Sequence, residues 1–210
     1  MLHDWDEALD YLYHFANWET RPPGTPLTFE LARARRVLAR LGDPQDAWPA
    51  VHIAGTNGKG STAALIDSVL RASGCRTGLY TSPHLHTVRE RVQIDGVPIG
   101  RAEVIEWLGR HRGILDAEAG LTTFEALTVM AFSTFAARKV DVAVVEVGLG
   151  GRLDTTNVVR PVVSVITAIG LDHTRVLGDT IGQIASDKAG ILRAGVPAVL
   201  APQQAEAEAV

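Results

Sequence analysis

The amino-acid sequence predicts an α/β fold, a doubly wound and mainly parallel sheet with helices on both faces. Short segments rich in β-branched residues alternate with longer segments in which apolar residues recur at helical spacing. One short segment, residues 140–147, is almost continuously apolar, which is typical of a central strand covered on both faces. A glycine-rich loop at residues 55–62 joins a strand to a helix. Ligands bind such sheets at the carboxyl ends of the strands, so we expect the functional site there.

The composition is that of a globular protein, and we expect one domain over residues 1–210. A formal net charge of -4 argues against a nucleic-acid or membrane partner that is held by bulk charge. Cys75 is the single cysteine, which excludes an intrachain disulfide and a cysteine metal cluster. The acidic N-terminus is unlike a signal peptide, and no apolar run reaches membrane-spanning length. We therefore expect a cytoplasmic protein that binds neither nucleic acid nor a membrane. We also expect it to be a monomer.

The first 50 residues predict two helices separated by a stiff loop. Asp4 and Glu7 resemble a capping box at the start of the first helix. Prolines make residues 21–26 a loop that is neither helix nor central strand. Thr28 is expected to cap a second helix that ends at Leu41, where glycine and proline follow.

A possible phosphate-binding loop follows the strand predicted over residues 51–54. Its glycines let backbone N–H groups approach an anion, the following helix adds positive potential at its N-terminus, and Lys59 supplies a charge. The sequence of this loop differs from the usual phosphate-loop motif, because Gly60 separates Lys59 from Ser61. The alternative is an ordinary glycine-rich turn. The predicted nucleotide-binding residues are Thr56, Asn57, Gly58, Lys59, Gly60, Ser61 and Thr62.

The middle of the chain predicts a hairpin and further strands and helices. After a strand over residues 76–81, Asp95 and Gly96 indicate a tight hairpin turn, and Pro98 confines its strand to a sheet edge. Thr122 and Glu125 form a capping box before another helix. The remaining expected elements are helices over residues 101–115, 126–137 and 180–188 and strands over residues 162–167 and 196–200. Residues 206–210 look like the first turns of a helix, so we expect a fragment of a longer protein.

Polar residues follow the ends of several predicted strands and are expected to converge on one crevice. They are Lys59, Ser82, Glu146, Asp154 and His173. A buried Glu146 needs a partner, which is either a magnesium ion or an arginine. His173 is either a ligand or an ordinary loop histidine, since magnesium prefers oxygen to imidazole. For Ser82 the alternative is a turn-initiating residue, for Lys188 a solvated charge, and for Phe124 a core residue.

Taken together, these motifs resemble the folate ligases of the Mur ligase family, the folylpolyglutamate synthases and the bifunctional dihydrofolate synthase/folylpolyglutamate synthases. The glycine between Lys59 and Ser61 is itself a feature of the phosphate-loop motif in the folate ligases. The matching segments are residues 52–61, 81–85, 122–125, 146–154, 171–173 and 186–191. The resemblance implies a Mur-ligase-like central domain, incomplete at its C-terminus, with the glutamate-binding C-terminal domain outside this chain.

The resemblance also implies a reaction and the residues that carry it. ATP and Mg²⁺ would activate a carboxylate of folate, or of dihydropteroate, as an acyl phosphate, which the amine of L-glutamate then attacks. Lys59, His173 and Lys188 would be catalytic, with Lys188 as a carbamate. The implied magnesium ligands are Ser82, Glu146 and His173, and the implied folate pocket is Thr122, Phe124 and Asp154.

Two other functions remain open on the sequence. One is a cell-wall Mur ligase, although those enzymes carry a whole precursor-binding domain before the phosphate loop and only 54 residues precede Gly55 here. The other is a nucleotide-binding module without catalysis, in which Glu146, His173 and Lys188 would have no use.

Overall fold

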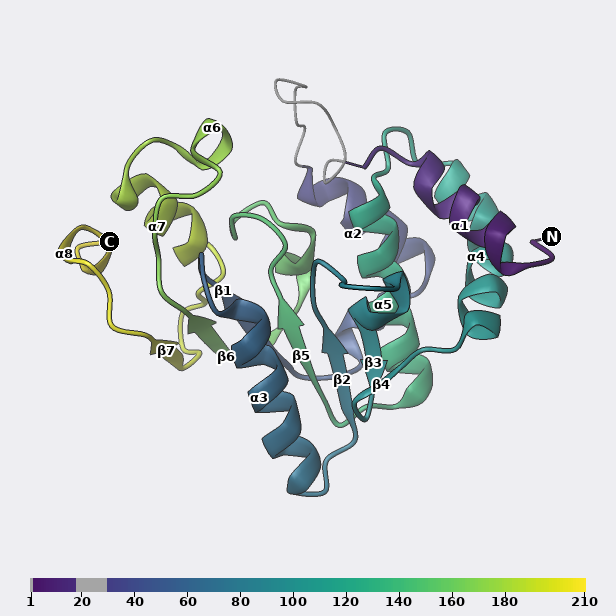
Figure 1. Cartoon of the computed structure of the whole chain (residues 1–210), viewed down its shortest axis with the longest axis horizontal. Coiled ribbons are helices and arrows are strands. Elements are labelled where there is room, and N and C mark those ends of the chain that lie inside the picture. Colours follow the sequence, from purple (N-terminus) through teal and green to yellow (C-terminus); the bar gives the residue numbers. More distant parts are fainter. Residues whose placement is uncertain (1, 18–29) are drawn as a thin grey trace.

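A computed structural model describes residues 2–17 and 30–210. Within these two ranges the chain forms a sheet of seven strands in the order β4-β3-β2-β5-β1-β6-β7 (Figure 1). The strands are β1 (Ala50–Ala54), β2 (Thr77–Tyr80), β3 (Val92–Ile94), β4 (Val97–Pro98), β5 (Val142–Glu146), β6 (Pro161–Ile166) and β7 (Ala198–Leu200). The five strands from β2 to β7 in this order are parallel, and β3 and β4 pair antiparallel at one end. The predicted mainly parallel α/β sheet is therefore confirmed.

Helices cover both faces of this sheet. They are α1 (Trp5–His14), α2 (Leu31–Arg40), α3 (Lys59–Ala72), α4 (Arg101–Asp116), α5 (Thr123–Arg138), α6 (Thr174–Leu177), α7 (Ile181–Ala189) and α8 (Ala205–Glu208). The described residues also form short 3₁₀ turns at η1 (Pro44–Asp46), η2 (Val88–Arg91) and η3 (Thr155–Val158). Helix α3 packs on β1, β2 and β5, while α6, α7 and α8 gather beside β6 and β7 (Figure 1). Among the described residues, no helix is long and apolar enough to cross a membrane.

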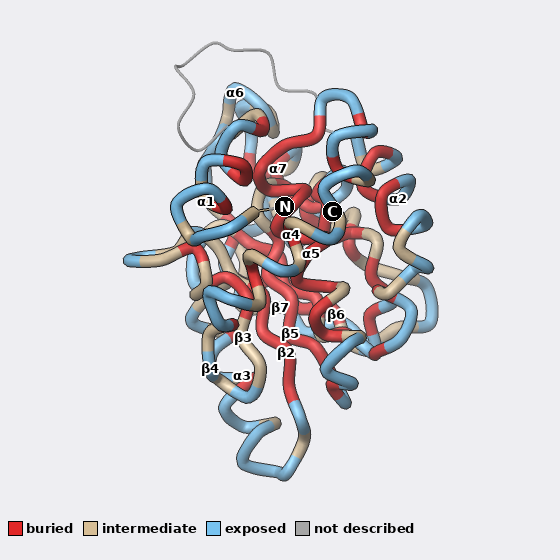
Figure 2. Tube along the Cα trace, turned by 90° about the vertical axis from the view of Figure 1, so that its right-hand side faces the viewer, coloured by how far each residue is buried: buried red, intermediate tan, exposed pale blue. Residues whose placement is uncertain are grey.

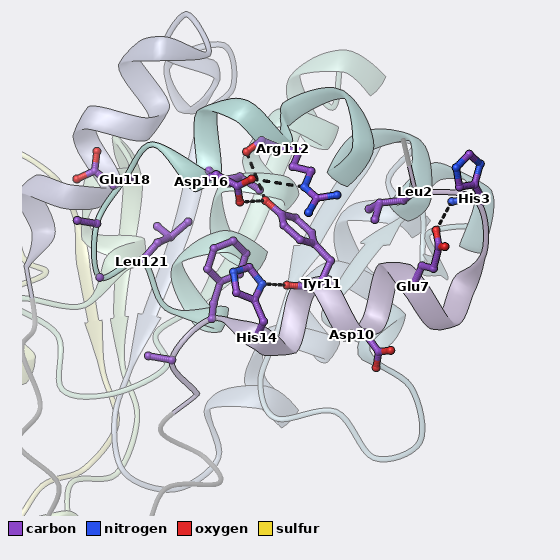
Figure 3. A pocket seen from close by; sticks show the side chains of 15 residues that line it. Leu2, His3, Glu7, Asp10, Tyr11, His14, Arg112, Asp116, Glu118 and Leu121 are labelled. Atoms are coloured by element: carbon purple, nitrogen blue, oxygen red, sulfur yellow. Dashed lines mark hydrogen bonds and ion pairs between the residues drawn. The ribbon is translucent and has the colours of Figure 1, made fainter.

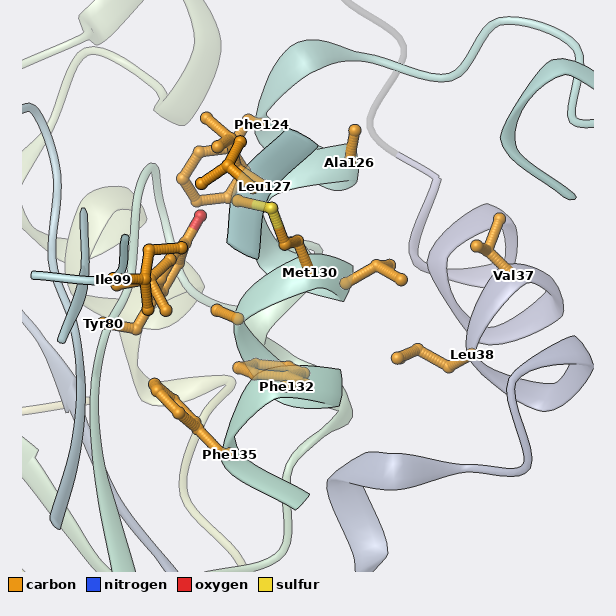
Figure 4. Close-up of a cluster of buried hydrophobic side chains, with 14 of the residues drawn as sticks. Val37, Leu38, Tyr80, Ile99, Phe124, Ala126, Leu127, Met130, Phe132 and Phe135 are labelled. Carbon is orange, nitrogen blue, oxygen red and sulfur yellow. The ribbon is translucent and has the colours of Figure 1, made fainter. Parts of the chain in front are cut away.

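The alternation of side chains along β5 divides the core between the two faces. Val144 packs with Ile53 beneath α3, whereas Ala143 and Val145 belong to the larger cluster on the opposite face. Helix α5 lies at the centre of that larger cluster, and α2 packs on its outer side (Figure 4). Every residue of β5 is buried, and buried residues continue through the central strands (Figure 2). The strand is covered on both faces, as its apolar run predicts.

Most local predictions agree with the structure. Thr122 caps α5 with a complete capping box, and Asp4 accepts a hydrogen bond at the start of α1. Asp95 and Gly96 have φ values of 51° and 75°, as a tight hairpin turn requires, and Pro98 lies on the edge strand.

The beginning of α2 differs from its prediction. The helix starts at Leu31 with Glu30 at the N-cap, and no side chain caps it. The predicted cap Thr28 and the predicted loop over residues 21–26 lie outside the described residues.

Candidate active site

The phosphate loop, residues 55–62, connects β1 to α3 through a backbone that requires glycine. Gly55 has a φ of 146°, and a Cβ placed there would lie 1.8 Å from Thr167 Oγ1. Gly58 is the N-cap of α3 with a φ of 83° and has open space around it. The left-handed conformation at Gly58 therefore turns the chain into the helix while leaving room in front of its first turn.

The first turn of α3 presents unpaired hydrogen-bond donors. Within the described part of the chain, no group accepts a hydrogen bond from the backbone N–H of Gly58, Lys59, Gly60 or Ser61. The next N–H, that of Thr62, donates to Gly58 O over 2.9 Å. Four free N–H groups at the start of a 14-residue helix fit a bound phosphate, because they supply donors together with the positive end of the helix dipole.

Glu146, the last residue of β5, lies directly beside this first turn. A Cβ on Gly60 would be 3.5 Å from Glu146 Oε2, and that oxygen accepts a hydrogen bond from the Ser82 N–H over 2.9 Å. Only 3% of Glu146 is exposed. Burial raises the pKa of Glu146 above that of an ordinary glutamate, while the Ser82 N–H and the positive charge of Lys59 oppose that rise. Lys59 Nζ itself donates to Thr56 O over 3.3 Å.

Lys188 reaches the phosphate loop from helix α7. Its Nζ donates to Gly55 O over 2.8 Å, and the residue is only 4% exposed. Burial, together with the neighbouring charge of Lys59, lowers the pKa of Lys188 to about 8. Lys188 is thus a buried amine within the candidate site and is not a solvated surface charge.

His173 is exposed, unlike the other two proposed metal ligands, Ser82 and Glu146. It is the N-cap of the short helix α6 with a φ of 49°, and 56% of its side chain is exposed. Its Nε2 lies 3.6 Å from Asp172 Oδ2. The structure thus brings Ser82 to Glu146 but leaves the His173 ring facing outward. In the described ranges, no three histidine, cysteine, aspartate or glutamate side chains form a ready-made metal site.

The three proposed folate residues all have structural partners. Thr122 Oγ1 donates to Glu125 Oε2 and accepts from the Glu125 N–H in the capping box of α5. Phe124 is buried in the larger core cluster, and a Cβ on Gly148 would lie 2.4 Å from its ring. Asp154 is also buried and accepts from the Leu149 N–H, the Thr156 N–H and the Thr156 hydroxyl. Phe124 and Asp154 are linked through the loop after β5, which carries Gly148 and Leu149.

The structure adds Arg91 to the surroundings of Glu146. This residue is 3% exposed, its Nε donates to His84 Nδ1 over 2.9 Å, and its charge lowers the pKa of Glu146 as a lesser influence than burial. The preceding Glu90 accepts hydrogen bonds from the backbone N–H groups of three residues, Leu85, His86 and Thr87. The spacing of Thr87 and Glu90, a capping-box pattern, was the available sequence signal for this turn.

A separate hollow of about 990 Å³ lies between α1 and α4 (Figure 3). Tyr11, His14, Arg112 and Asp116 line it, and the Tyr11 hydroxyl donates to Asp116 Oδ1 over 2.7 Å. Burial and this carboxylate raise the pKa of Tyr11. None of the residues that line this hollow belongs to the phosphate loop or to the residues proposed above. The candidate active site is therefore the group around the phosphate loop.

Comparisons with known proteins agree on one family. The Mur ligase middle domain matches residues 53–201. The chain is 47% identical over 183 residues to the dihydrofolate synthase/folylpolyglutamate synthase of Bacillus subtilis, a match that covers 84% of this chain and 43% of that protein. It is 41% identical over 213 residues to the folylpolyglutamate synthase of Lacticaseibacillus casei, which covers 99% and 48%.

A solved structure, an FPGS-AMPPCP-folate complex, superposes with a TM-score of 0.90 at 41% identity and covers 99% of this chain and 50% of that one. The chain spans 43% and 48% of the length of these two curated relatives, and as little as 23% of the length of others. Because the family domain covers most of the sequence, including the phosphate loop, Glu146 and Lys188, the chain belongs to the Mur ligase family.

Proposed function

We propose that this chain is the ATP-binding half of a ligase that joins L-glutamate to folate, and that dihydropteroate is a second acceptor. The observation that carries the proposal is the set of four unpaired N–H groups at the start of α3, with Lys59 and the buried Glu146 beside them. The substrates come from the relatives, which are folylpolyglutamate and dihydrofolate synthases. The glutamate site is assigned to the part of those longer proteins that this chain does not match.

The nucleotide would bind through its phosphates at the phosphate loop. The N–H groups of Gly58 to Ser61 donate to phosphate oxygens, and Lys59 exchanges its bond to Thr56 O for a phosphate oxygen. The FPGS-AMPPCP-folate complex supports a nucleotide in this fold. Phosphoryl transfer depends mainly on positioning and on stabilising developing negative charge, so these donors are the catalytic contribution of the loop.

Glu146 and Ser82 fit the proposed magnesium site. Their oxygens are the kind of ligand that Mg²⁺ prefers, and a buried carboxylate with a raised pKa gains most from a nearby cation. We assign His173 as the third ligand on the resemblance, and its exposed ring must turn inward to serve. When bound, Mg²⁺ would neutralise negative charge on the phosphates.

Lys188 is proposed to act as a carbamate. The reaction needs a neutral amine: the nitrogen lone pair attacks carbon dioxide, an N–C bond forms as one C=O π bond breaks onto its oxygen, and the nitrogen releases a proton, which leaves an anionic carbamate. Burial and the charge of Lys59 lower the pKa of Lys188 to about 8, which makes the neutral form accessible. A negative group in this position would complement Lys59 and a bound cation, whereas an ammonium would repel both.

The overall reaction then has two displacements. A carboxylate oxygen of the folate acceptor attacks the γ-phosphorus and ADP leaves, which gives an acyl phosphate. The glutamate amine attacks the acyl carbon and phosphate leaves, with loss of a proton from the amine. Thr122, Phe124 and Asp154 are proposed to border the folate pocket beside this centre.

Calorimetric titration of the chain with AMPPCP and Mg²⁺ tests the proposal. Lys59→Ala and Glu146→Gln should each weaken binding at least tenfold, as expected for loss of a charged contact worth about 1.5–3 kcal/mol. Arg110→Ala, which removes an exposed charge on α4, is the matched control and should bind normally. Unchanged affinity in both site variants, with circular dichroism showing folded protein, contradicts the proposal.

A further inference from the structure

His52 is a fully buried histidine in the middle of β1. Its Nε2 lies 2.9 Å from Thr156 Oγ1, and its Nδ1 has no hydrogen-bond partner among the described residues. Burial, with a lesser influence from the charge of Arg193, lowers the pKa of His52 to about 3, so the ring is neutral at neutral pH. A neutral imidazole carries one N–H, and its neighbour determines which nitrogen holds the proton.

The Thr156 hydroxyl determines which nitrogen of His52 carries the proton. Thr156 Oγ1 donates its only proton to Asp154 Oδ1 over 2.5 Å. Its oxygen can therefore only accept from the ring, which places the histidine proton on Nε2 and leaves Nδ1 as a buried, unpaired acceptor. A directed sequence of hydrogen bonds thus runs from His52 through Thr156 to Asp154.

Asp154 also bonds to the loop after β5, residues 148–152. Its Oδ2 accepts from the Leu149 N–H over 2.9 Å, while its Oδ1 also accepts from the Thr156 N–H over 2.9 Å. The loop in turn packs against the end of α7. The Arg152 N–H donates to Asp187 O over 2.9 Å, and a Cβ on Gly151 would lie 2.8 Å from Lys188 Cα. The loop held by Asp154 is therefore the surface on which the backbone of Lys188 rests.

We propose that His52 is a positioning residue for Lys188. Its Nε2–H commits the Thr156 proton to Asp154, and Asp154 then fixes the loop after β5 in the shape that holds the Lys188 amine against Gly55 O. That the position of the Lys188 amine matters for catalysis rests on the proposed function. The packing of the loop after β5 can be measured whether or not that function is correct.

The first test is nitrogen NMR of the chain with labelled histidine at neutral pH. His52 should show a protonated Nε2 and an unprotonated Nδ1. A proton on Nδ1, or a doubly protonated ring, overturns the proposal, because the Thr156 proton would then be free to point elsewhere.

The second test is amide hydrogen exchange at Leu149 and Arg152. His52→Leu and Thr156→Val should each accelerate exchange at these two amides about fivefold, the effect of losing one net hydrogen bond. His52→Gln keeps a side-chain N–H and Thr156→Ser keeps the hydroxyl, so both should restore protection. Thr77→Val is the matched control, because it removes a buried hydroxyl that donates to Asp67 Oδ1 over 2.6 Å on another strand. Equal acceleration in this control, or none in the first two variants, overturns the proposal.

The pKa of Lys188 links the loop to the amine. In His52→Leu the pKa of Lys188 should rise from about 8 toward the ordinary lysine value of 10.5. Carbon NMR of labelled lysine over a pH titration measures this pKa. A pKa that stays at about 8 while the loop amides exchange faster would show that the loop does not hold Lys188, and the proposal would fall. If the proposed function is wrong, the result is different: the chain without substitutions does not bind AMPPCP.

Discussion

The amine of Lys188 and the carbonyl oxygen of Gly55, 133 residues apart in sequence, are joined by a hydrogen bond of 2.8 Å. This contact ties helix α7 to the first residue of the phosphate loop. It also takes a cation out of water and sets it near the charge of Lys59, which explains the lowered pKa of Lys188. The lowered pKa of Lys188 is thus a product of long-range packing.

The first prediction concerns how stability depends on pH. The folded pKa of Lys188 is about 8 and the ordinary value is 10.5, so between these pH values the unfolded chain binds the proton and the folded chain does not. The free energy of unfolding contributed by Lys188 should therefore rise from pH 8 to pH 10.5. Urea titrations of the chain and of Lys188→Met across this range should diverge. Parallel curves would show that the amine has an ordinary pKa.

A second prediction concerns the carbamate. Carbon NMR with labelled bicarbonate should show a carbamate resonance that strengthens as the pH rises through about 8, since only the neutral amine reacts. Lys188→Met should remove the signal. Lys139→Gly, at an exposed lysine with a φ of 52°, should keep it. A resonance that survives Lys188→Met would place the modification elsewhere.

A third prediction separates function from stability at Glu146. Burial raises the pKa of Glu146, so its ionised form destabilises the fold fully above the raised pKa, and this cost declines to zero as the pH falls from the raised pKa to the ordinary glutamate pKa. Glu146→Gln should raise the free energy of unfolding at neutral pH by about 1 kcal/mol, as often follows when a functional group is removed from a buried site. Denaturant titration measures this, and a loss of stability would mean that the carboxylate contributes to the fold.

The fourth prediction tests the glycine requirement of the phosphate loop. Gly55→Ala forces a Cβ to within 1.8 Å of Thr167 Oγ1 at a φ of 146°, so it should lower the free energy of unfolding by about 3 kcal/mol. Gly100→Ala is the control, because its Cβ meets nothing within 4 Å. Thermal unfolding should separate the two variants clearly, and equal midpoints would refute the steric argument.

The last prediction concerns the buried ion pair that holds the start of α5. Arg33 Nε donates to Glu125 Oε1 over 3.0 Å, and Glu125 also receives both donors of Thr122. Glu125→Ala leaves a buried guanidinium without this partner and should cost about 3–5 kcal/mol. Glu106→Ala, which breaks an exposed pair with Arg110, should cost less than about 0.5 kcal/mol. A small effect of Glu125→Ala in denaturant titrations would show that the pair is dispensable.

The sequence by itself determined the order and type of the main elements and the position of the phosphate loop. Apolar periodicity, the Thr122 capping box and the Asp95-Gly96 turn are local signals. Each depends on residues that are close together in the sequence, so it predicts an element without knowledge of the tertiary structure. The strand run over residues 140–147 predicted a central position because only a strand covered on both faces tolerates so few polar residues.

Tertiary structure decided which polar groups meet. The sequence indicates no role for the His52 side chain, yet in the fold its ring lies beside Thr156, which is 104 positions away. From its place on a predicted helix Lys188 would be a solvated charge, but in the fold its amine donates to Gly55 O. His173, which the resemblance implies as a metal ligand, has an exposed side chain. Burial and hydrogen-bond direction depend on contacts between distant segments, and those contacts exist only once the chain has folded.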